Sequence, residues 1–252
     1  FGADDYQTCK RYGMDMVVPV DDQGRHTDYA GKYEGMLVEE SNPVILNDMK
    51  EAGSLFASEE IVHSYPHCWR CKHEVVFKLV DEWSIATAEL KPSLIAAANT
   101  VKWEPDFAGK RMVDWLNNMG DWNISRKRFY GLPLPFYPCK KCGRLTVVGS
   151  KEELLELSEN HSLDGVLHLH RPYIDTVKIR CPKCGGLVER VPEVGDCWLD
   201  AGITPFSTKK YFSDKDYFNK NFPSELVIEM KEQIRLWFYS LLFMSVVLTG
   251  KA

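Results

Sequence analysis

Cys139-Lys-Lys-Cys142-Gly and Cys181-Pro-Lys-Cys184-Gly-Gly decide how the middle of this chain folds. Each stretch has the Cys-x-x-Cys spacing with which one tight turn points two thiolates at one metal ion. Two such turns complete a tetrahedral site made of sulfur alone. The glycine after each pair suits the turn, because it accepts a positive φ. The pattern predicts a structural zinc ion at these four cysteines, and the alternatives are disulfides or idle thiols.

The composition is that of a globular protein in a reducing compartment. The 252 residues suffice for one large or two modest domains, and 44% of them are hydrophobic. The net charge of −5 gives no global basic field for nucleic acid, although local basic patches remain compatible with it. Six of the eight cysteines lie in Cys-x-x-Cys pairs, which favours metal binding in the cytoplasm. The longest uncharged run, 236–250, is too short to cross a membrane, so we expect no membrane association.

The hydrophobic pattern predicts strands that alternate with helices, which is typical of an α/β fold. Strands are expected at 75–80, 82–86 and 226–228, and the longest helices at 110–119 and 231–248. Ser150-Lys-Glu-Glu153 is a capping box, so a further helix is expected between the two cysteine pairs. The chain opens without an initiator Met, and we expect it to be an internal piece of a longer protein.

Five motifs follow one another along nearly the whole chain. They are Phe1-Gly-Ala-Asp-Asp-Tyr6, His63-Ser-Tyr-Pro-His-Cys-Trp-Arg-Cys71, Asp121-Trp-Asn-Ile-Ser-Arg-Lys-Arg128 with Tyr130-Gly-Leu-Pro-Leu-Pro135, Asp196-Cys-Trp-Leu-Asp-Ala-Gly202, and Glu229-Met-Lys-Glu-Gln233-Ile-Arg235-Leu-Trp237-Phe238. In this order they resemble the isoleucyl-tRNA synthetase family, which belongs with the valyl and leucyl enzymes to the class I synthetases. The resemblance implies an α/β fold: part of a Rossmann-like catalytic domain, a zinc-ribbon insertion and the C-terminal edge of an editing domain.

The order of the motifs also implies domain boundaries. Residues 1–60 would end the editing domain, and 61–136 would be the first Rossmann-like portion of the catalytic domain. Residues 137–190 would be the zinc-ribbon insertion, and 191–252 the second Rossmann-like portion.

The resemblance implies an ATP-dependent ligase. The complete enzyme would activate isoleucine to an aminoacyl-adenylate with ATP and Mg²⁺, transfer it to tRNA(Ile), and hydrolyse mischarged tRNA. We expect that enzyme to be a monomer. The family's His-Ile-Gly-His and Lys-Met-Ser-Lys-Ser strings, which stabilise the triphosphate, do not occur here, so this piece alone is expected to be inactive. The alternatives are a valyl- or leucyl-tRNA synthetase fragment, or a stand-alone zinc-ribbon module that binds nucleic acid.

The same resemblance assigns roles to single residues. Asp5 matches an editing aspartate that anchors the α-ammonium of a misacylated amino acid, a task that suits a carboxylate. Its alternative is a solvated acidic turn. Glu229 and Gln233 would line the adenylate site, sharing one face at a helix N-terminus directly after a buried strand. Trp198 and Trp237 would shape the amino-acid pocket.

Two further groups keep open interpretations. In related synthetases the pair that matches Cys68 and Cys71 completes a zinc site with a second Cys-x-x-Cys before the editing domain, which lies outside this chain. We therefore expect an incomplete half-site there. The run Arg126-Lys-Arg128 either supports the catalytic core and the approach of the tRNA acceptor end, or is a solvated face.

Overall fold

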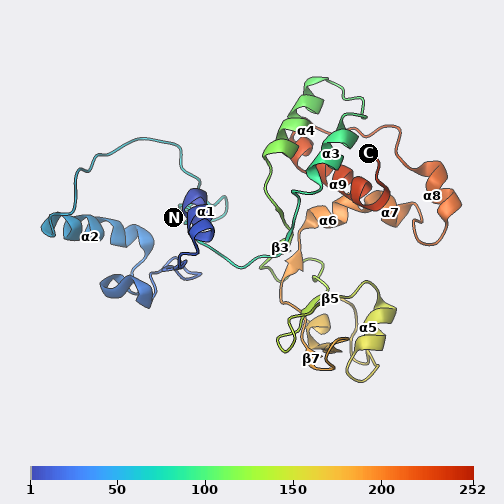
Figure 1. Ribbon diagram of the computed structural model, residues 1–252, viewed down its shortest axis with the longest axis horizontal. Helices are drawn as coiled ribbons and strands as arrows, with labels where there is room; N and C mark the ends of the chain where they lie inside the picture. Colours follow the sequence, from blue (N-terminus) through green and yellow to red (C-terminus); the bar gives the residue numbers. More distant parts are fainter. Residues whose placement is uncertain (1) are drawn as a thin grey trace. The chain divides into compact units, whose positions relative to one another are not determined.

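The computed structural model describes residues 2–252 and divides into two compact units, Phe1–Asp81 and Glu82–Ala252 (Figure 1). Phe1, the first residue of the first motif, lies outside the described residues. Among the described residues, no helix has both the length and the apolar character that a membrane span requires.

The first unit contains three helical segments and little core. They are α1 (Ala3–Tyr12), η1 (Asp28–Tyr33) and α2 (Val38–Glu51). Asp5 lies in the first turn of α1, where its carboxylate accepts the Gly2 N–H at 2.7 Å. The buried Ser41 of α2 is 2.8 Å from the His26 ring, which fixes the loop before η1 against the helix. Apolar side chains such as Phe56 and Val62 are fully exposed.

The strand expected at 75–80 is absent. The segment contributes no ladder, and Phe77 is 66% exposed. Only an isolated bridge between His67 and Glu74 precedes it. Alternating apolar residues form a strand only when a second backbone pairs with them along their length, and among the described residues this segment has a single backbone hydrogen bond, from the Val75 N–H to the Pro66 carbonyl at 3.1 Å.

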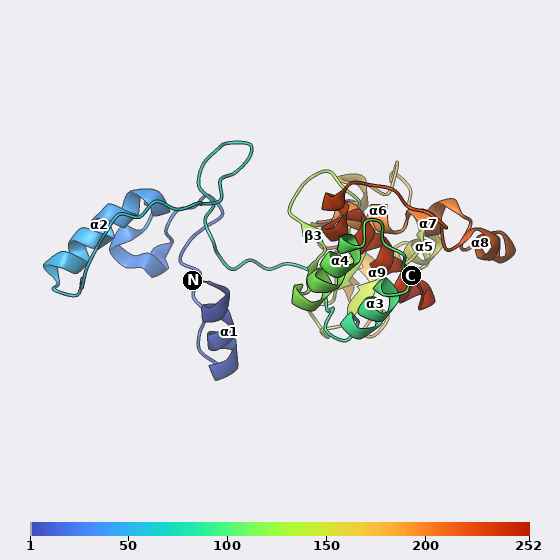
Figure 2. The same ribbon diagram turned by 90° about the horizontal axis from the view of Figure 1, so that it is seen from above.

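The core of the second unit is helical, and α9 lies at its centre (Figure 2). Helix α9 packs against α3 and α6, and α3 packs against α4. The helices are α3 (Lys91–Ala98), α4 (Phe107–Asn118), α6 (Cys197–Gly202), α7 (Thr204–Thr208), α8 (Lys215–Asn221), η3 (Lys231–Arg235) and α9 (Trp237–Thr249).

Helix α4 confirms the helix predicted at 110–119. Its buried residues Ala108, Met112 and Leu116 recur every four positions, which puts them on one face, and they pack against Leu94 of α3.

The structure differs from both predictions made for residues 226–249. Leu226 and Ile228 are 73% and 77% exposed and form no strand, so the predicted buried strand is wrong. As at 75–80, no neighbouring strand in the described part of the chain pairs with this segment. The expected helix 231–248 is interrupted, because Leu236 (φ −121°, ψ −108°) separates η3 from α9.

The strands of the second unit form four antiparallel pairs. β1 (Ser84–Ile85) pairs with β2 (Trp122–Asn123), and β3 (Ser125–Arg126) pairs with β8 (Val194–Gly195). β4 (Phe136–Pro138) pairs with β5 (Leu145–Val147), and β6 (Ile179–Arg180) pairs with β7 (Leu187–Val188). The last two hairpins, with α5 (Lys151–Leu157) and η2 (Tyr173–Thr176), enclose a small core around Tyr137 and Ile179. We call this part the ribbon.

The capping box correctly predicted α5. The Ser150 hydroxyl accepts the Glu153 N–H at 3.1 Å, and the Glu153 carboxylate accepts the Gly149 N–H at 2.7 Å.

Gly202 allows α6 to lie directly on α9. A Cβ at this position would be 2.8 Å from the Ser240 carbonyl oxygen and 3.0 Å from Met244 Cγ. Gly202→Ala should therefore lower the free energy of unfolding by about 1–3 kcal/mol, because the carbonyl cannot yield. Urea unfolding of the 252-residue chain measures it. Gly120→Ala is the matched control, since no atom lies within 4 Å of its Cβ position. Equal losses in both variants would contradict this packing.

Candidate functional site

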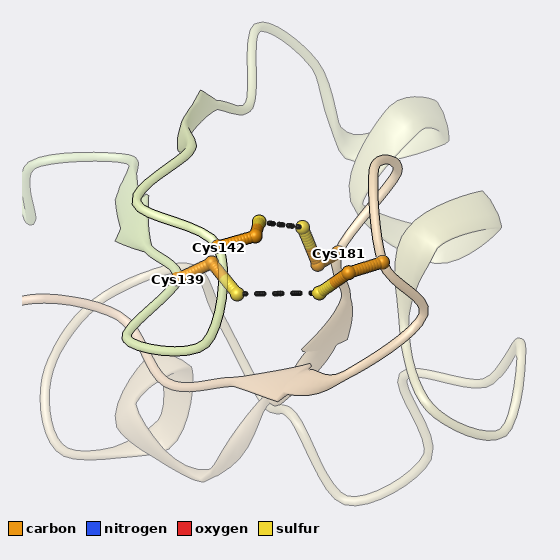
Figure 3. Close-up of side chains that lie close together, drawn as sticks. Cys139, Cys142 and Cys181 are labelled. Atoms are coloured by element: carbon orange, nitrogen blue, oxygen red, sulfur yellow. Dashed lines mark hydrogen bonds between the residues drawn. The ribbon is translucent and has the colours of Figure 1, made fainter.

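The four cysteines of the two Cys-x-x-Cys pairs converge in the ribbon. Their sulfur atoms all lie within 4.8 Å of one another. Cys139 and Cys184 are 3.6 Å apart, as are Cys142 and Cys181 (Figure 3). A disulfide requires about 2.05 Å between sulfurs, and all eight cysteines are free. The structure therefore brings the predicted ligands together as separate thiols.

Both turns have the same backbone. The Cys139 N–H donates to Arg144 and the Gly143 N–H donates back to Cys139, each at 2.8 Å. Cys181 repeats the pattern with Gly186 and Gly185. The glycine that closes each turn has a positive φ, 71° at Gly143 and 68° at Gly185. Each glycine predicted to suit the turn thus takes the left-handed conformation that the turn needs.

Main-chain N–H groups stabilise thiolates in these turns. The N–H groups of Lys183 and Cys184 lower the pKa of Cys181 to about 6. The N–H groups of Cys142 and Lys141 likewise lower the pKa of Cys139. At Cys142 the Arg144 N–H also lowers the pKa, but burial and the neighbouring thiols outweigh it and raise the pKa to about 11. Four thiols at this distance therefore do not all ionise by themselves.

A divalent cation bound between the four sulfurs would stabilise all four as thiolates. Four thiolates arranged around Zn²⁺ at about 2.3 Å have sulfurs about 3.8 Å apart, close to the separations of 3.6 Å found here. The residues present therefore fit a tetrahedral sulfur site, and Cys139, Cys142, Cys181 and Cys184 are the groups that would hold the ion.

The Cys68–Cys71 turn of the first unit has the same backbone. The Cys68 N–H donates to His73, and the Lys72 N–H donates back to Cys68, both at 2.8 Å. Lys72 takes the closing position with φ 65°, a conformation that a non-glycine residue rarely adopts. The N–H groups of Cys71 and Arg70 lower the pKa of Cys68. This turn has the form of half a metal site, although no third His, Cys, Asp or Glu joins it among the described residues.

Two arginines of the ribbon attach it to the segments on either side. The buried Arg190 donates to the carbonyls of Leu134 at 3.1 Å and Glu193 at 2.9 Å, and it forms an ion pair with Asp175. Asp175 also accepts from Arg171 at 2.7 Å, and these two guanidinium groups keep its pKa low in spite of burial. Sequence reasoning missed this network, because isolated Arg and Asp residues carry no spacing signal.

Asp196 connects the segment that carries Trp122 and Arg126 with helix α6. It is 4% exposed, and it accepts from the Trp198 N–H at 3.1 Å, which caps α6. Its other oxygen accepts from Arg126 at 2.8 Å and from the Trp122 indole at 3.4 Å. Arg126 therefore has a specific partner and is not simply part of a solvated face.

This network borders a cavity of about 360 Å³ with aromatic walls. Trp198, predicted to shape the amino-acid pocket, lines it. Other lining residues that sequence reasoning did not single out are Trp115, Trp122, Arg235 and Tyr239. Trp122 and Arg235 lie inside two of the quoted motifs, whereas Trp115 and Tyr239 lie outside them and carry no spacing signal of their own.

The remaining predicted residues lie apart from this cavity lining. Trp237 donates its indole N–H to the Ala201 carbonyl at 3.0 Å, and its backbone N–H donates to Gln233 at 3.1 Å. Glu229 is exposed and precedes η3, so the expectation that it shares a helix face with Gln233 is wrong. Helix η3 begins only at Lys231, after the extended Met230 (φ −75°, ψ 161°), so Glu229 lies outside the helix. Asp5 is exposed in α1.

Removing the Asp196 carboxylate should destabilise the second unit. Asp196→Ala removes the acceptor of Arg126 Nη2 and of the Trp122 indole, and it removes the α6 cap, a loss of about 2–4 kcal/mol. Urea unfolding measures it, and tryptophan fluorescence should change with the loss of the Trp122 contact. Glu189→Ala is the control, because Glu189 pairs with Lys178 in an exposed ion pair that water screens, so its removal should change the stability little. Equal stability of the two variants would contradict the role of Asp196.

Comparisons with known proteins identify the scaffold. The family model described as "tRNA synthetases class I (I, L, M and V)" matches residues 6–252. Among the curated relatives, the Isoleucine–tRNA ligase of Archaeoglobus fulgidus is 41% identical over the whole chain, and that of Methanosarcina mazei is 38% identical. The Isoleucine–tRNA ligase of Clostridium novyi is 42% identical over 98% of the chain.

The chain spans about a quarter of the length of these relatives, 24%, 23% and 24% respectively. A solved structure, the ternary complex of Agrobacterium radiobacter K84 agnB2 LeuRS with tRNA and LeuAMS, is 24% identical, with a TM-score of 0.36 over 53% of this chain and 18% of that one. The family model, which covers almost every residue, and the identity to the relatives show that this chain belongs to the class I tRNA synthetases.

Proposed function

We propose that this chain is the part of an isoleucine–tRNA ligase that carries one wall of the synthetic site, a zinc ribbon and the edge of the editing domain. The complete protein would use ATP and Mg²⁺ to activate isoleucine, transfer it to tRNA(Ile), and hydrolyse mischarged tRNA. The observation that carries this proposal is the identity of 38–42% to proteins named Isoleucine–tRNA ligase in two archaea and one bacterium.

The four-part division predicted from the sequence remains part of the proposal. Residues 1–60 would end the editing domain, 61–136 and 191–252 would belong to the catalytic domain, and 137–190 would be its zinc insertion. A stand-alone ribbon is not proposed, because the family model matches on both sides of the ribbon. We expect the 252 residues alone to give no isoleucine-dependent ATP–pyrophosphate exchange, since neither phosphate-handling motif is among them.

The aromatic cavity supports a role in amino-acid selection. Trp198 contributes an apolar wall, and the Asp196 cap fixes the turn of α6 from which this side chain starts. Trp237 is held on α6 through Ala201, so a substrate that contacts either tryptophan would contact one rigid unit. An apolar wall discriminates a missing methylene by only about 1–3 kcal/mol, which is the physical reason for a second, hydrolytic site.

The placement and chemistry of Asp5 support the editing role proposed for it. The carboxylate is exposed at the first turn of α1, in the unit that excludes Trp198 and Trp237. A carboxylate there is able to accept a charge-assisted hydrogen bond from an ammonium group. Glu229 and Gln233 would act on the other reaction, at the adenylate.

We propose zinc as the ion held by the ribbon cysteines, in a structural role. Replacing Cys142 by Ser should release the ion and loosen residues 137–190, because three thiolates no longer complete the site. Metal analysis of chelator-washed protein should find about one zinc per unaltered chain. Cys197→Ser is the control, since Cys197 is exposed and lies outside the cluster. Full zinc retention by the Cys142 variant would show that the ligand set is misassigned.

Two substitutions in the complete enzyme should separate its two reactions. Asp5→Ala removes a charge-assisted bond of roughly 1.5–3 kcal/mol, so hydrolysis of valine-charged tRNA should fall about ten- to a hundredfold. Activation of isoleucine should remain nearly intact. Glu229→Ala should depress adenylate formation and spare hydrolysis of mischarged tRNA.

Asp4→Ala and Glu232→Ala are the neighbouring controls, because each removes an exposed carboxylate close to the tested one. Both reactions would be measured on all four variants. If Asp5→Ala lowered activation as much as editing, the assignment of two separate sites would be wrong.

A further inference from the structure

Five cations surround the cysteine cluster of the ribbon. Each lies within two residues of one of the four cysteines, and each is exposed: Lys140, Lys141, Arg144, Arg180 and Lys183. We call them the knuckle cations. Because the four sulfurs lie within 4.8 Å of one another, both turns that carry these residues meet at one end of the ribbon (Figure 3).

One contact shows that the two turns share this surface. The Lys141 side chain of the first turn extends over Gly186 of the second, with its Cδ 3.7 Å from the position that a Cβ on Gly186 would occupy. The first turn's Lys141 therefore lies over the second turn, so the two turns and their cations share one part of the ribbon.

The acids of the ribbon are elsewhere. Glu152, Glu153 and Glu156 lie in α5, and Glu159 and Asp164 follow it. The acid on the cysteine hairpins, Glu189, forms an ion pair with Lys178 at 2.7 Å, and it also lies near enough to Lys140 for that charge to contribute to the lowered pKa of Glu189. Within residues 2–252, none of the knuckle cations forms an ion pair. An acidic chain of net charge −5 thus has a positive surface at the cysteine turns.

The metal centre does not account for this charge. Four thiolates and one Zn²⁺ leave two negative charges, which the knuckle cations exceed by three. A surplus of like charges at close range is unfavourable unless a partner neutralises it.

We propose that the knuckle cations form a docking surface for the phosphate backbone of RNA. The proposal rests on the proposed function, which supplies tRNA as the RNA partner. Phosphates at regular spacing match several cations held at fixed positions by the two turns, and the contacts would be independent of base sequence. Flexible acidic peptides offer no such fixed spacing.

The test uses the whole 252-residue chain loaded with zinc. A fluorescein-labelled RNA hairpin that reproduces the acceptor stem of tRNA(Ile) is titrated at several salt concentrations, with fluorescence anisotropy as the readout. In the variant Lys140→Gln/Lys141→Gln/Lys183→Gln, the slope of log K against log[salt] should fall by about two to three, at roughly 0.7–0.9 per lost phosphate contact. Lys102→Gln/Lys110→Gln/Lys151→Gln removes the same charge from exposed lysines elsewhere and should leave the slope unchanged.

Three results would overturn the proposal. The first is an equal loss of slope in the control, which would show a non-specific charge effect. The second is a loss of zinc from the first variant, which would show that the lysines serve the metal centre. The third is competition by polyglutamate as effective as that by unlabelled RNA at equal charge. A complete enzyme that charges no tRNA would refute the proposed function and leave this binding result standing, so the two failures are distinguishable.

Discussion

The close approach of four thiols is the constraint on which the ribbon, and through it the segments beside the candidate synthetic site, depends. Each strand of the two hairpins that carry them is only two or three residues long, and such short strand pairs have little stability of their own. A cation that binds all four sulfurs ties both hairpins to one point, and its binding energy becomes folding energy. The ribbon core around Tyr137 and Ile179 can then form on a fixed frame.

This constraint reaches the candidate synthetic site through the backbone. Arg190 leaves the ribbon and binds the carbonyls of Leu134 and Glu193, the two segments that lead into and out of it. The segment around Glu193 continues into β8, which pairs with β3, and then into Asp196. The carboxylate of Asp196 accepts from the Arg126 guanidinium, and it caps α6 by accepting from the Trp198 N–H. The cysteine cluster is in this way connected to the residues proposed to select the amino acid.

Local signals predicted what local physics determines. The Cys-x-x-Cys spacing with its trailing glycines predicted the cysteine cluster, and a capping box predicted α5, because both depend on residues a few positions apart. The strands expected at 75–80 and 226–228 failed for the opposite reason. A strand needs a partner from elsewhere, and apolar residues such as Phe77 and Ile228 remain exposed without one. The Asp175–Arg190 pair and the Asp196–Arg126 pair join residues far apart in sequence, so no spacing reveals them.

The most direct test of this account is X-ray absorption spectroscopy at the zinc edge on the purified 252-residue chain. The account predicts one zinc whose first shell consists of four sulfur atoms at about 2.3 Å, with no nitrogen or oxygen ligand. A first shell with histidine nitrogen or water oxygen in place of any sulfur would contradict it. That result would mean that the two cysteine turns do not form one centre and that the ribbon is not held in the way described.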